Sequence, residues 1–221
     1  MNAICVRLTT FRLHIILTGF ALLATAGCAH MKEVKVQPSP LPPRTGEQKV
    51  PVRVALVLDD TLSGHKLESK QGAYLLGPAL TQYARQVTES TFTQVATFLS
   101  LDAAANQADV ILHPAPGKTE ATGSATVDPF ASMGVRGKRY IMLVVEWTLL
   151  DRTGKDTLWL RGVAGNSSRT VTFAQIVGVS PTGNKRERIA FQALFDDLAQ
   201  RTQKAFDESQ EIQRLGKPAA Q

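Results

Sequence analysis

The clearest periodic signal in the chain is an alternation of apolar positions over residues 138–151. Every second residue from Ile141 to Leu149 is apolar, so an extended strand here presents one wholly apolar face. A glycine-containing turn at 151–155 and a second apolar stretch at 158–164 follow. This arrangement predicts a β-hairpin.

Two further strands are predicted earlier in the chain. Residues 52–58 are β-branched and almost continuously apolar, which is typical of a strand buried on both faces. Residues 109–113 form a compact apolar run that ends at Pro114. Residues 169–179 are a candidate for another strand, and residues 92–98 either prolong a helix or begin a strand.

Two amphipathic helices are predicted. The first begins near Pro78, and its apolar residues at 80, 83, 84 and 87 fall on one helical face. The second is the C-terminal helix, for which Asn184 and Glu187 have capping-box spacing and Gly216 is a natural stop. Its apolar face is formed by Phe191, Leu194, Phe195, Leu198, Ala205 and Phe206. These side chains are expected to pack on the sheet.

Residues 115–137 are rich in Gly, Ser, Thr and Pro and lack periodicity, so we expect a long loop that is mobile or functional. The order of elements predicts an α/β (α+β) sandwich. It would have a mixed or antiparallel sheet of about four to five strands, with two main helices packed on it.

The N-terminal 27 residues have the layout of an export signal. Arg7 and Arg12 provide a positive region, and residues 13–26 form an apolar stretch shorter than a membrane span. Small residues, ending in Gly27, lie directly before Cys28. An ordinary secretory signal that is cleaved near residue 26 is the alternative interpretation.

These residues resemble the lipobox of bacterial lipoproteins, with Thr25 at the position where most lipoboxes carry Leu. The resemblance implies cleavage before Cys28 and acylation of its sulfur, with a palmitate-type chain. Ala29 follows the cysteine, which by the usual sorting rule implies the periplasmic face of a Gram-negative outer membrane.

The mature chain is predicted to have three parts. Residues 28–50 include a cluster of prolines between 38 and 43, which predicts a semi-rigid tether that lifts the domain away from the bilayer. A proline-dependent docking motif is the alternative for this segment. Residues 51–215 form a single periplasmic α/β domain, and residues 216–221 form a disordered tail.

Composition narrows the chemistry. The formal net charge is +6, or +4 without the two signal-peptide arginines, which suits anionic lipid or cell-wall polymer but is too small to indicate nucleic-acid binding. The chain has only two cysteines, Cys5 in the signal and Cys28. If Cys28 is acylated, no thiol remains for catalysis, zinc binding or a disulfide.

The search for catalytic residues gives few candidates. Asp59 and Asp60 end a buried strand, where carboxylates serve either in active sites or, more often, in turns. His65 and His113 have no metal-ligand spacing, and no nucleophile or phosphate-loop motif occurs. We therefore expect no metal, no cofactor and no enzymatic activity. Glu146 lies within the apolar strand, where it marks either a binding surface or a charge that protects an edge strand.

The segments 54–58, 108–114 and 146–147, together with the closing helix, resemble small periplasmic lipoproteins of envelope assembly. This group includes the curli-secretion channel lipoprotein and the outer-membrane activators of peptidoglycan synthases. The resemblance implies a fold and a location, and it carries no catalytic residues.

The leading hypothesis is a non-enzymatic outer-membrane lipoprotein that binds or scaffolds envelope proteins. Lys185, Arg186, Arg188, Glu146 and residues 118–136 are the candidate partner contacts, and the bilayer is reached through Cys28. Two alternatives stay open. One is a subunit of an oligomeric export channel, which requires residues 115–137 to insert as a β-hairpin. The other is an enzyme acting on cell-wall polymer with Asp59 or Asp60.

Overall fold

The computed structural model describes residues 32–33, 38–42, 44–45, 48–69, 72–127, 135–172 and 183–216. The predicted signal peptide, Cys28 and most of the predicted C-terminal tail lie outside these residues.

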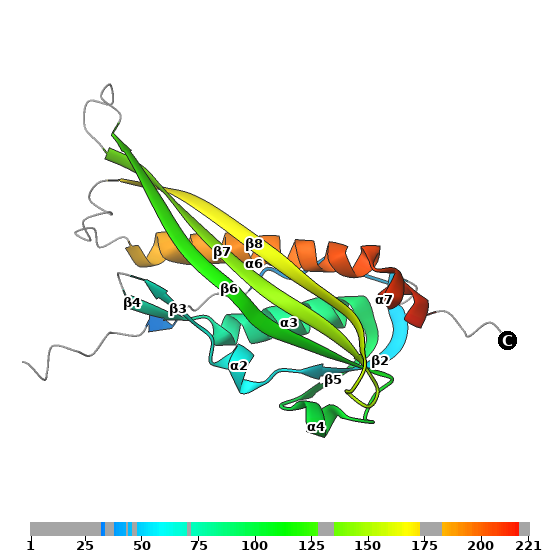
Figure 1. Cartoon of the computed structure of the whole chain (residues 1–221). Helices are drawn as coiled ribbons and strands as arrows, with labels where there is room; N and C mark the ends of the chain where they lie inside the picture. The colour runs from blue at the N-terminus through cyan, green and yellow to red at the C-terminus, as the bar shows by residue number, and fades with distance from the viewer. Residues whose placement is uncertain are drawn as a thin grey trace, which may run out of the picture.

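A five-stranded mixed sheet runs the length of the domain in the order β5-β2-β6-β7-β8 (Figure 1). β2 (Val50–Val57) is parallel to both of its neighbours, β5 (Phe92–Phe98) and β6 (Val110–Val127). β7 (Val135–Asp151) pairs antiparallel with β6 and with β8 (Thr157–Thr172). The predicted mixed α/β class is confirmed.

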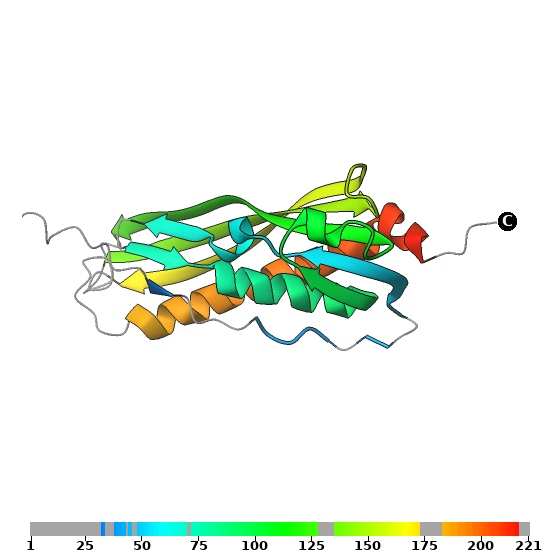
Figure 2. The same cartoon turned by 90° about the horizontal axis from the view of Figure 1, so that it is seen from below.

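Helices cover one face of this sheet. α3 (Gly77–Thr91) and α6 (Gly183–Glu208) lie side by side on it, and α7 (Gln210–Leu215) follows α6 at the C-terminal end (Figures 1 and 2). Two single-turn helices, α2 (Asp60–Ser63) and α4 (Leu101–Ala104), follow β2 and β5. α4 packs on the opposite face of the sheet, over a small apolar cluster formed by Ala55, Val57, Ala104, Ala108, Ile111 and Leu150.

A second, small sheet lies at one end of the molecule. β1 (Lys32–Glu33) pairs parallel with β4 (Gly72–Leu75), which pairs antiparallel with β3 (Lys66–Ser69). Figure 1 shows this sheet at the same end as the tip of the β6–β7 hairpin and the start of α6.

The main core contains a cluster of aromatic rings between the sheet and α6. Trp147 of β7 is fully buried, and its ring meets Phe206 edge-on at 5.1 Å and Tyr83 at 6.0 Å. The Trp147 indole N–H donates to the Tyr83 hydroxyl at 3.2 Å, and that hydroxyl lies 2.5 Å from the hydroxyl of Thr202. Burial raises the pKa of Tyr83 far above its usual range, so the phenol stays neutral. The three polar groups satisfy one another inside the apolar core.

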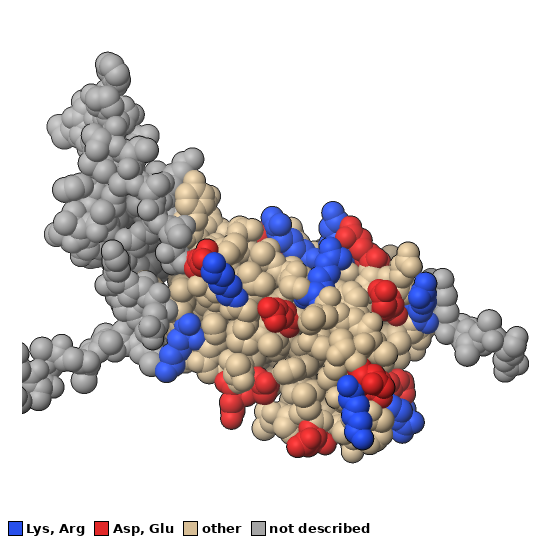
Figure 3. All heavy atoms as spheres, viewed as in Figure 1, with Lys and Arg blue, Asp and Glu red and all other residues tan. Residues whose placement is uncertain are grey.

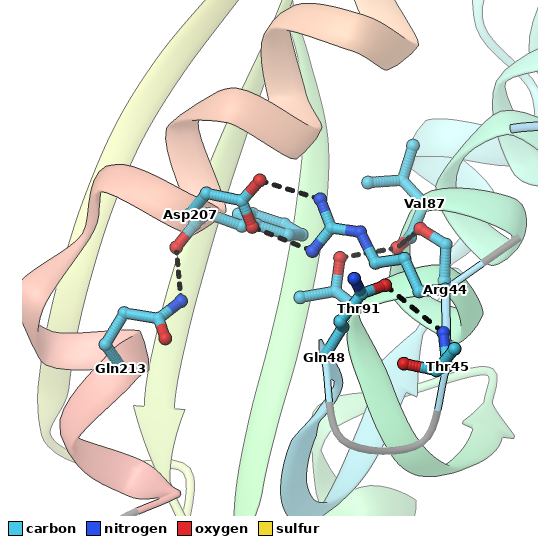
Figure 4. Close-up of polar contacts among 9 residues, drawn as sticks. Arg44, Thr45, Gln48, Val87, Thr91, Asp207 and Gln213 are labelled. Carbon is cyan, nitrogen blue, oxygen red and sulfur yellow. Dashed lines mark hydrogen bonds and ion pairs between the residues drawn. The ribbon is translucent and has the colours of Figure 1, made fainter. Parts of the chain in front are cut away.

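The proline-rich segment is docked on the domain along α6. Pro38 is buried, and Leu41 packs against the main core. The backbone N–H and hydroxyl of Ser39 donate to Asp196 at 2.9 and 3.0 Å. Arg44 makes a bidentate pair with Asp207 at 2.8 and 2.7 Å (Figure 4).

The geometry of the segment agrees with an extended polyproline conformation. The five residue-to-residue steps from Ser39 to Arg44 span about 16 Å in that conformation, and the eleven steps along α6 from Asp196 to Asp207 rise by about the same length. The segment therefore runs parallel to the helix, as Figure 2 shows along the lower edge of the molecule. The prediction of a spacer that lifts the domain is wrong for the described part of this segment, because its polar groups and apolar side chains bind α6.

Other local predictions need correction. The expected loop at 115–137 is β-structure wherever it is described, because β6 continues to Val127 and β7 begins at Val135. Residues 92–98 form strand β5, and β8 is one strand through Thr172 rather than two short ones. α6 begins at Gly183, so Asn184 lies in its first turn and not at the N-cap. The predicted single C-terminal helix is interrupted at Ser209, whose hydroxyl caps α7.

Candidate functional site

A groove of about 530 Å³ runs between the outer edge of the main sheet and α6. One wall is β8, the last strand of the sheet, and the other is the polar face of α6. Its lining residues are Arg161, Gly162, Val163, Ala164, Asp197, Gln200, Arg201, Lys204, Ala205 and Glu208.

The backbone of β8 offers hydrogen-bonding groups to this groove. The Asn166 N–H points away from β7, since it donates to the Asp197 carboxylate of α6 at 2.8 Å. The N–H and C=O of one residue in a strand point to the same side, and the side alternates along the chain. Gly162 and Ala164 therefore also direct their backbone groups outward, and no described side chain bonds to them.

α6 closes the groove at Gly165. A Cβ atom at this position would lie 2.7 Å from Leu198 Cβ and 3.0 Å from the Leu194 carbonyl oxygen. Only glycine allows the helix to approach the strand this closely. The groove lies beside the preceding residues of β8, from Arg161 to Ala164.

The charges in the groove are mixed. On α6, Arg201 pairs with Asp197 at 2.9 Å and Lys204 with Glu208 at 3.6 Å. The exposed guanidinium of Arg161 on β8 has no acidic partner among the described residues. The groove therefore has one spare cation beside a row of backbone donors and acceptors.

A second polar cluster lies where β2 ends. Asp59 accepts the Leu62 N–H at 3.0 Å as the N-cap of α2, and its other oxygen lies 2.9 Å from His113 Nε2 of β6. Burial raises the pKa of Asp59, but the Leu62 N–H and the His113 ring outweigh it and hold the pKa below its usual value.

The contact between Asp59 and His113 gives both side chains a structural role. β2 and β6 are adjacent, with Leu56 opposite Leu112, so the two side chains meet although they are 54 residues apart in sequence. Among the described residues, no serine or threonine hydroxyl bonds to the His113 ring. Asp60 is exposed in α2. Asp59 therefore caps α2 and also holds this cap against the neighbouring strand β6 through His113.

We expect Asp59→Asn to lower the free energy of unfolding by about 1 kcal/mol at pH 7, since Asn keeps the cap but loses the charge beside His113. The folded-state pKa of Asp59 lies below the unfolded value. Ionised Asp59 therefore stabilises the folded state at pH values above the usual pKa range of a carboxyl group. This stabilisation is lost as the pH falls through the folded-state pKa. Urea denaturation from pH 7 to about pH 2 should show the free energies of unfolding of the wild-type chain and of Asp59→Asn converging as the pH falls. A constant difference across that range would contradict this role.

The structure separates the predicted contact residues. Glu146 is exposed on the face of the sheet opposite α3 and α6, and its neighbour Val144 is half-buried there. Lys185 and Arg186 lie in the first turn of α6, followed by the exposed Arg188. These basic residues belong to the end of the molecule that carries the hairpin tip, while the groove lies farther along α6. Cys28 lies outside the described residues.

Sequence reasoning missed the groove and the Asp59–His113 pair. The signals available were Gly162 and Gly165 in a strand, since glycine there often marks a close backbone approach. In the described part of the chain, no cluster of three or more His, Cys, Asp or Glu side chains is placed to hold a metal ion. No helix in that part is long and apolar enough to cross a membrane.

Comparisons with known proteins give structural likenesses only. No family model matches the sequence, and no curated protein matches it.

Several solved structures are distantly similar to this chain. A minor lipoprotein from Acinetobacter baumannii is 17% identical, with a TM-score of 0.36, over 76% of this chain and 96% of that one. A Helicobacter pylori protein described as a putative neuraminyllactose-binding hemagglutinin homolog is 10% identical, with a TM-score of 0.49, over 82% and 96%. Lipoprotein B from Nitrosomonas europaea, described as uncharacterized, is 12% identical, with a TM-score of 0.38, over 74% and 88%. Similarities at this level do not assign a family or a function.

Proposed function

We propose that this protein is a non-enzymatic lipoprotein of the outer membrane that is acylated at Cys28 and faces the periplasm. There it binds or scaffolds an envelope protein in assembly or transport. The lipobox supports the anchor, and the groove between β8 and α6 supports the binding role. The capping role of Asp59 supports a structural use of the carboxylates that were the best catalytic candidates.

The groove is suited to an extended peptide segment. An edge strand recognises such a segment by adding it to the sheet through backbone hydrogen bonds. The four residues from Arg161 to Ala164 span about 13 Å, enough for a short stretch of added strand. The spare charge of Arg161 favours a segment with an acidic side chain at this point.

Gly162→Pro tests the groove directly. Proline removes the outward N–H, and an edge strand tolerates it where that N–H faces solvent. Ser168→Pro is the matched control, because Ser168 is an exposed outward position of the same strand outside the groove. Affinity capture from envelope extract should recover the same partner with the wild-type chain and with Ser168→Pro, but not with Gly162→Pro. Equal recovery by all three chains, or recovery by none, would contradict the proposal.

The hairpin formed by β6 and β7 favours a second candidate, a subunit of an oligomeric export channel. Against it, residues 122–127 of β6 are threonine, glycine, serine, alanine, threonine and valine, a sequence too weakly apolar for a face that contacts hydrocarbon. The mass of the purified protein in detergent separates the two candidates, because a monomer rules out the channel.

A further inference from the structure

We propose that the outer edge of β5 binds a second copy of this chain. The two β5 strands pair antiparallel about a two-fold axis that passes between the two copies of Val95, so the main sheets of two molecules become one. This edge lies on the opposite side of the sheet from the β8 groove. The inference therefore rests neither on that groove nor on the lipid anchor.

β5 is an edge strand without the usual protection against pairing. Within the described residues it pairs with β2 alone (Figure 1). Natural edge strands are commonly protected by charged side chains or prolines, because their unpaired backbone groups otherwise bind another strand. The chain from Ser90 to Leu101 contains no charged residue and no proline. By contrast, basic and acidic side chains are interspersed on the face of the molecule shown in Figure 3.

Three residues of β5 direct their backbone groups away from the sheet. The Leu58 N–H donates to the Phe98 carbonyl oxygen at 2.9 Å, so the backbone groups of Phe98 point toward β2. The side alternates along a strand, and Thr93, Val95 and Thr97 therefore direct theirs outward. No described residue forms a hydrogen bond with these outward groups. They have the spacing that an antiparallel partner strand requires.

The sequence of β5 is nearly symmetric about Val95. Thr93 and Thr97 lie two residues on either side of it, and phenylalanines lie three residues on either side, at positions 92 and 98. Two copies paired antiparallel about Val95 therefore place each threonine opposite a threonine, and such pairs stabilise a sheet. The same register joins the outward backbone groups of Thr93 to those of Thr97, and those of Val95 to its own copy. The strand is thus complementary to itself.

The surroundings of this edge add apolar surface and no net charge. Leu99, directly after β5, is 79% exposed, more than any other large hydrophobic residue that the structure describes. In the proposed register it comes next to the start of β5 in the second copy. α3, which leads directly into β5, has two charged residues, Arg85 and Glu89, and both are exposed. Because their charges cancel, two copies meet here without net electrostatic repulsion.

A contact of this kind closes at two copies, because each chain uses the same edge of its sheet. The product is a dimer in which two five-stranded sheets are joined, and β8 forms both outer edges. Both β8 grooves stay accessible to other partners. The dimer also differs from the ring of subunits that an export channel requires.

The test exchanges charges at Thr93 and Thr97, whose side chains are exposed. The full chain from residue 28, with Cys28→Ser, is exported from an ordinary secretory signal peptide, and sedimentation equilibrium measures its dimer dissociation constant without detergent. Thr93→Lys, Thr97→Lys places lysine opposite lysine in both pairs and should weaken the dimer at least about ten-fold. Thr93→Glu, Thr97→Glu should do the same. An equimolar mixture of the two variants should restore dimers, since each pair then joins opposite charges.

The matched control is Thr157→Lys, Ser168→Lys, which makes the same charge change at exposed positions of β8. Its dissociation constant should match that of the parent chain. A parent chain that stays monomeric at its highest soluble concentration would overturn the proposal, as would lysine variants that dimerise like the parent. So would an equal loss in the control, or a mixture that does not restore pairing. These results are separate from partner capture at the β8 groove, which Gly162→Pro tests.

Discussion

Replacing Trp147 with alanine is expected to lower the free energy of unfolding by about 3–5 kcal/mol, a large share of the roughly 5–15 kcal/mol that stabilises a typical domain. The side chain is fully buried between α3, α6 and the sheet, and it contacts Phe206 and Tyr83. Truncation opens a cavity among rigid aromatic rings, which cannot collapse to fill it. The loss also removes the indole donor from the Tyr83 hydroxyl.

Trp159→Ala provides the comparison for this substitution. Trp159 lies on the neighbouring strand and contacts the same Phe206 ring at 5.7 Å, but it is only partly buried. Its replacement should therefore cost clearly less than that of Trp147. Urea denaturation followed by far-ultraviolet circular dichroism measures both, because that signal does not depend on tryptophan. Similar losses for the two variants would contradict the placement of Trp147 at the centre of the core.

Gly165→Ala should destabilise the protein by about 1–3 kcal/mol, although it adds a single methyl group. The new Cβ would lie 2.7 Å from Leu198 Cβ, 3.0 Å from the Leu194 carbonyl oxygen and 3.1 Å from Leu198 Cα. Two of these three atoms belong to the backbone of α6, so a side-chain rotation cannot relieve the overlap. The helix itself has to move away from β8.

Gly162→Ala is the control for this effect, three residues earlier on the same strand. There an added Cβ meets Val144 Cγ1 at 3.7 Å, an ordinary contact. Alanine also reduces the conformational freedom of the unfolded chain, so this variant should be neutral or slightly more stable. Thermal unfolding of the two variants checks the contrast, and a Gly165→Ala chain as stable as Gly162→Ala would show that α6 does not close on β8.

Alternation and helical periodicity predicted the elements whose side chains bury an apolar face. In β7 the odd-numbered residues from Leu143 to Leu149 are all buried, and Glu146 is exposed between them, as the sequence indicates. The same holds for α3, where Leu80, Tyr83 and Val87 form the buried face. Burial of one face leaves a period in the sequence, and that period is readable without a structure.

Segments stabilised by their backbone were not predictable in this way. Residues 119–127 lack periodicity, yet they form a strand because each pairs with β7, from Thr119 opposite Leu143 to Val127 opposite Val135. Contacts between distant residues were also beyond reach. The pairing of Arg44 with Asp207 and of Asp59 with His113 depends on which elements become neighbours, and local sequence carries no record of that.

The candidate contact residues and the groove also differ in how far the sequence could predict them. Lys185, Arg186 and Arg188 were recognisable as a basic cluster in sequence, but their position at the end of the molecule that carries the tip of the β6–β7 hairpin became apparent only from the fold. The groove was not recognisable, because its features are an unpaired strand edge and a glycine under a helix.

The identity of the mature N-terminus tests the account most directly. Intact-mass and peptide mass spectrometry of the protein recovered from bacterial membranes should show a chain that begins at Cys28 and carries a diacylglyceryl group on its sulfur. A chain that begins elsewhere, or an unmodified Cys28, would contradict the anchor on which the proposed location depends.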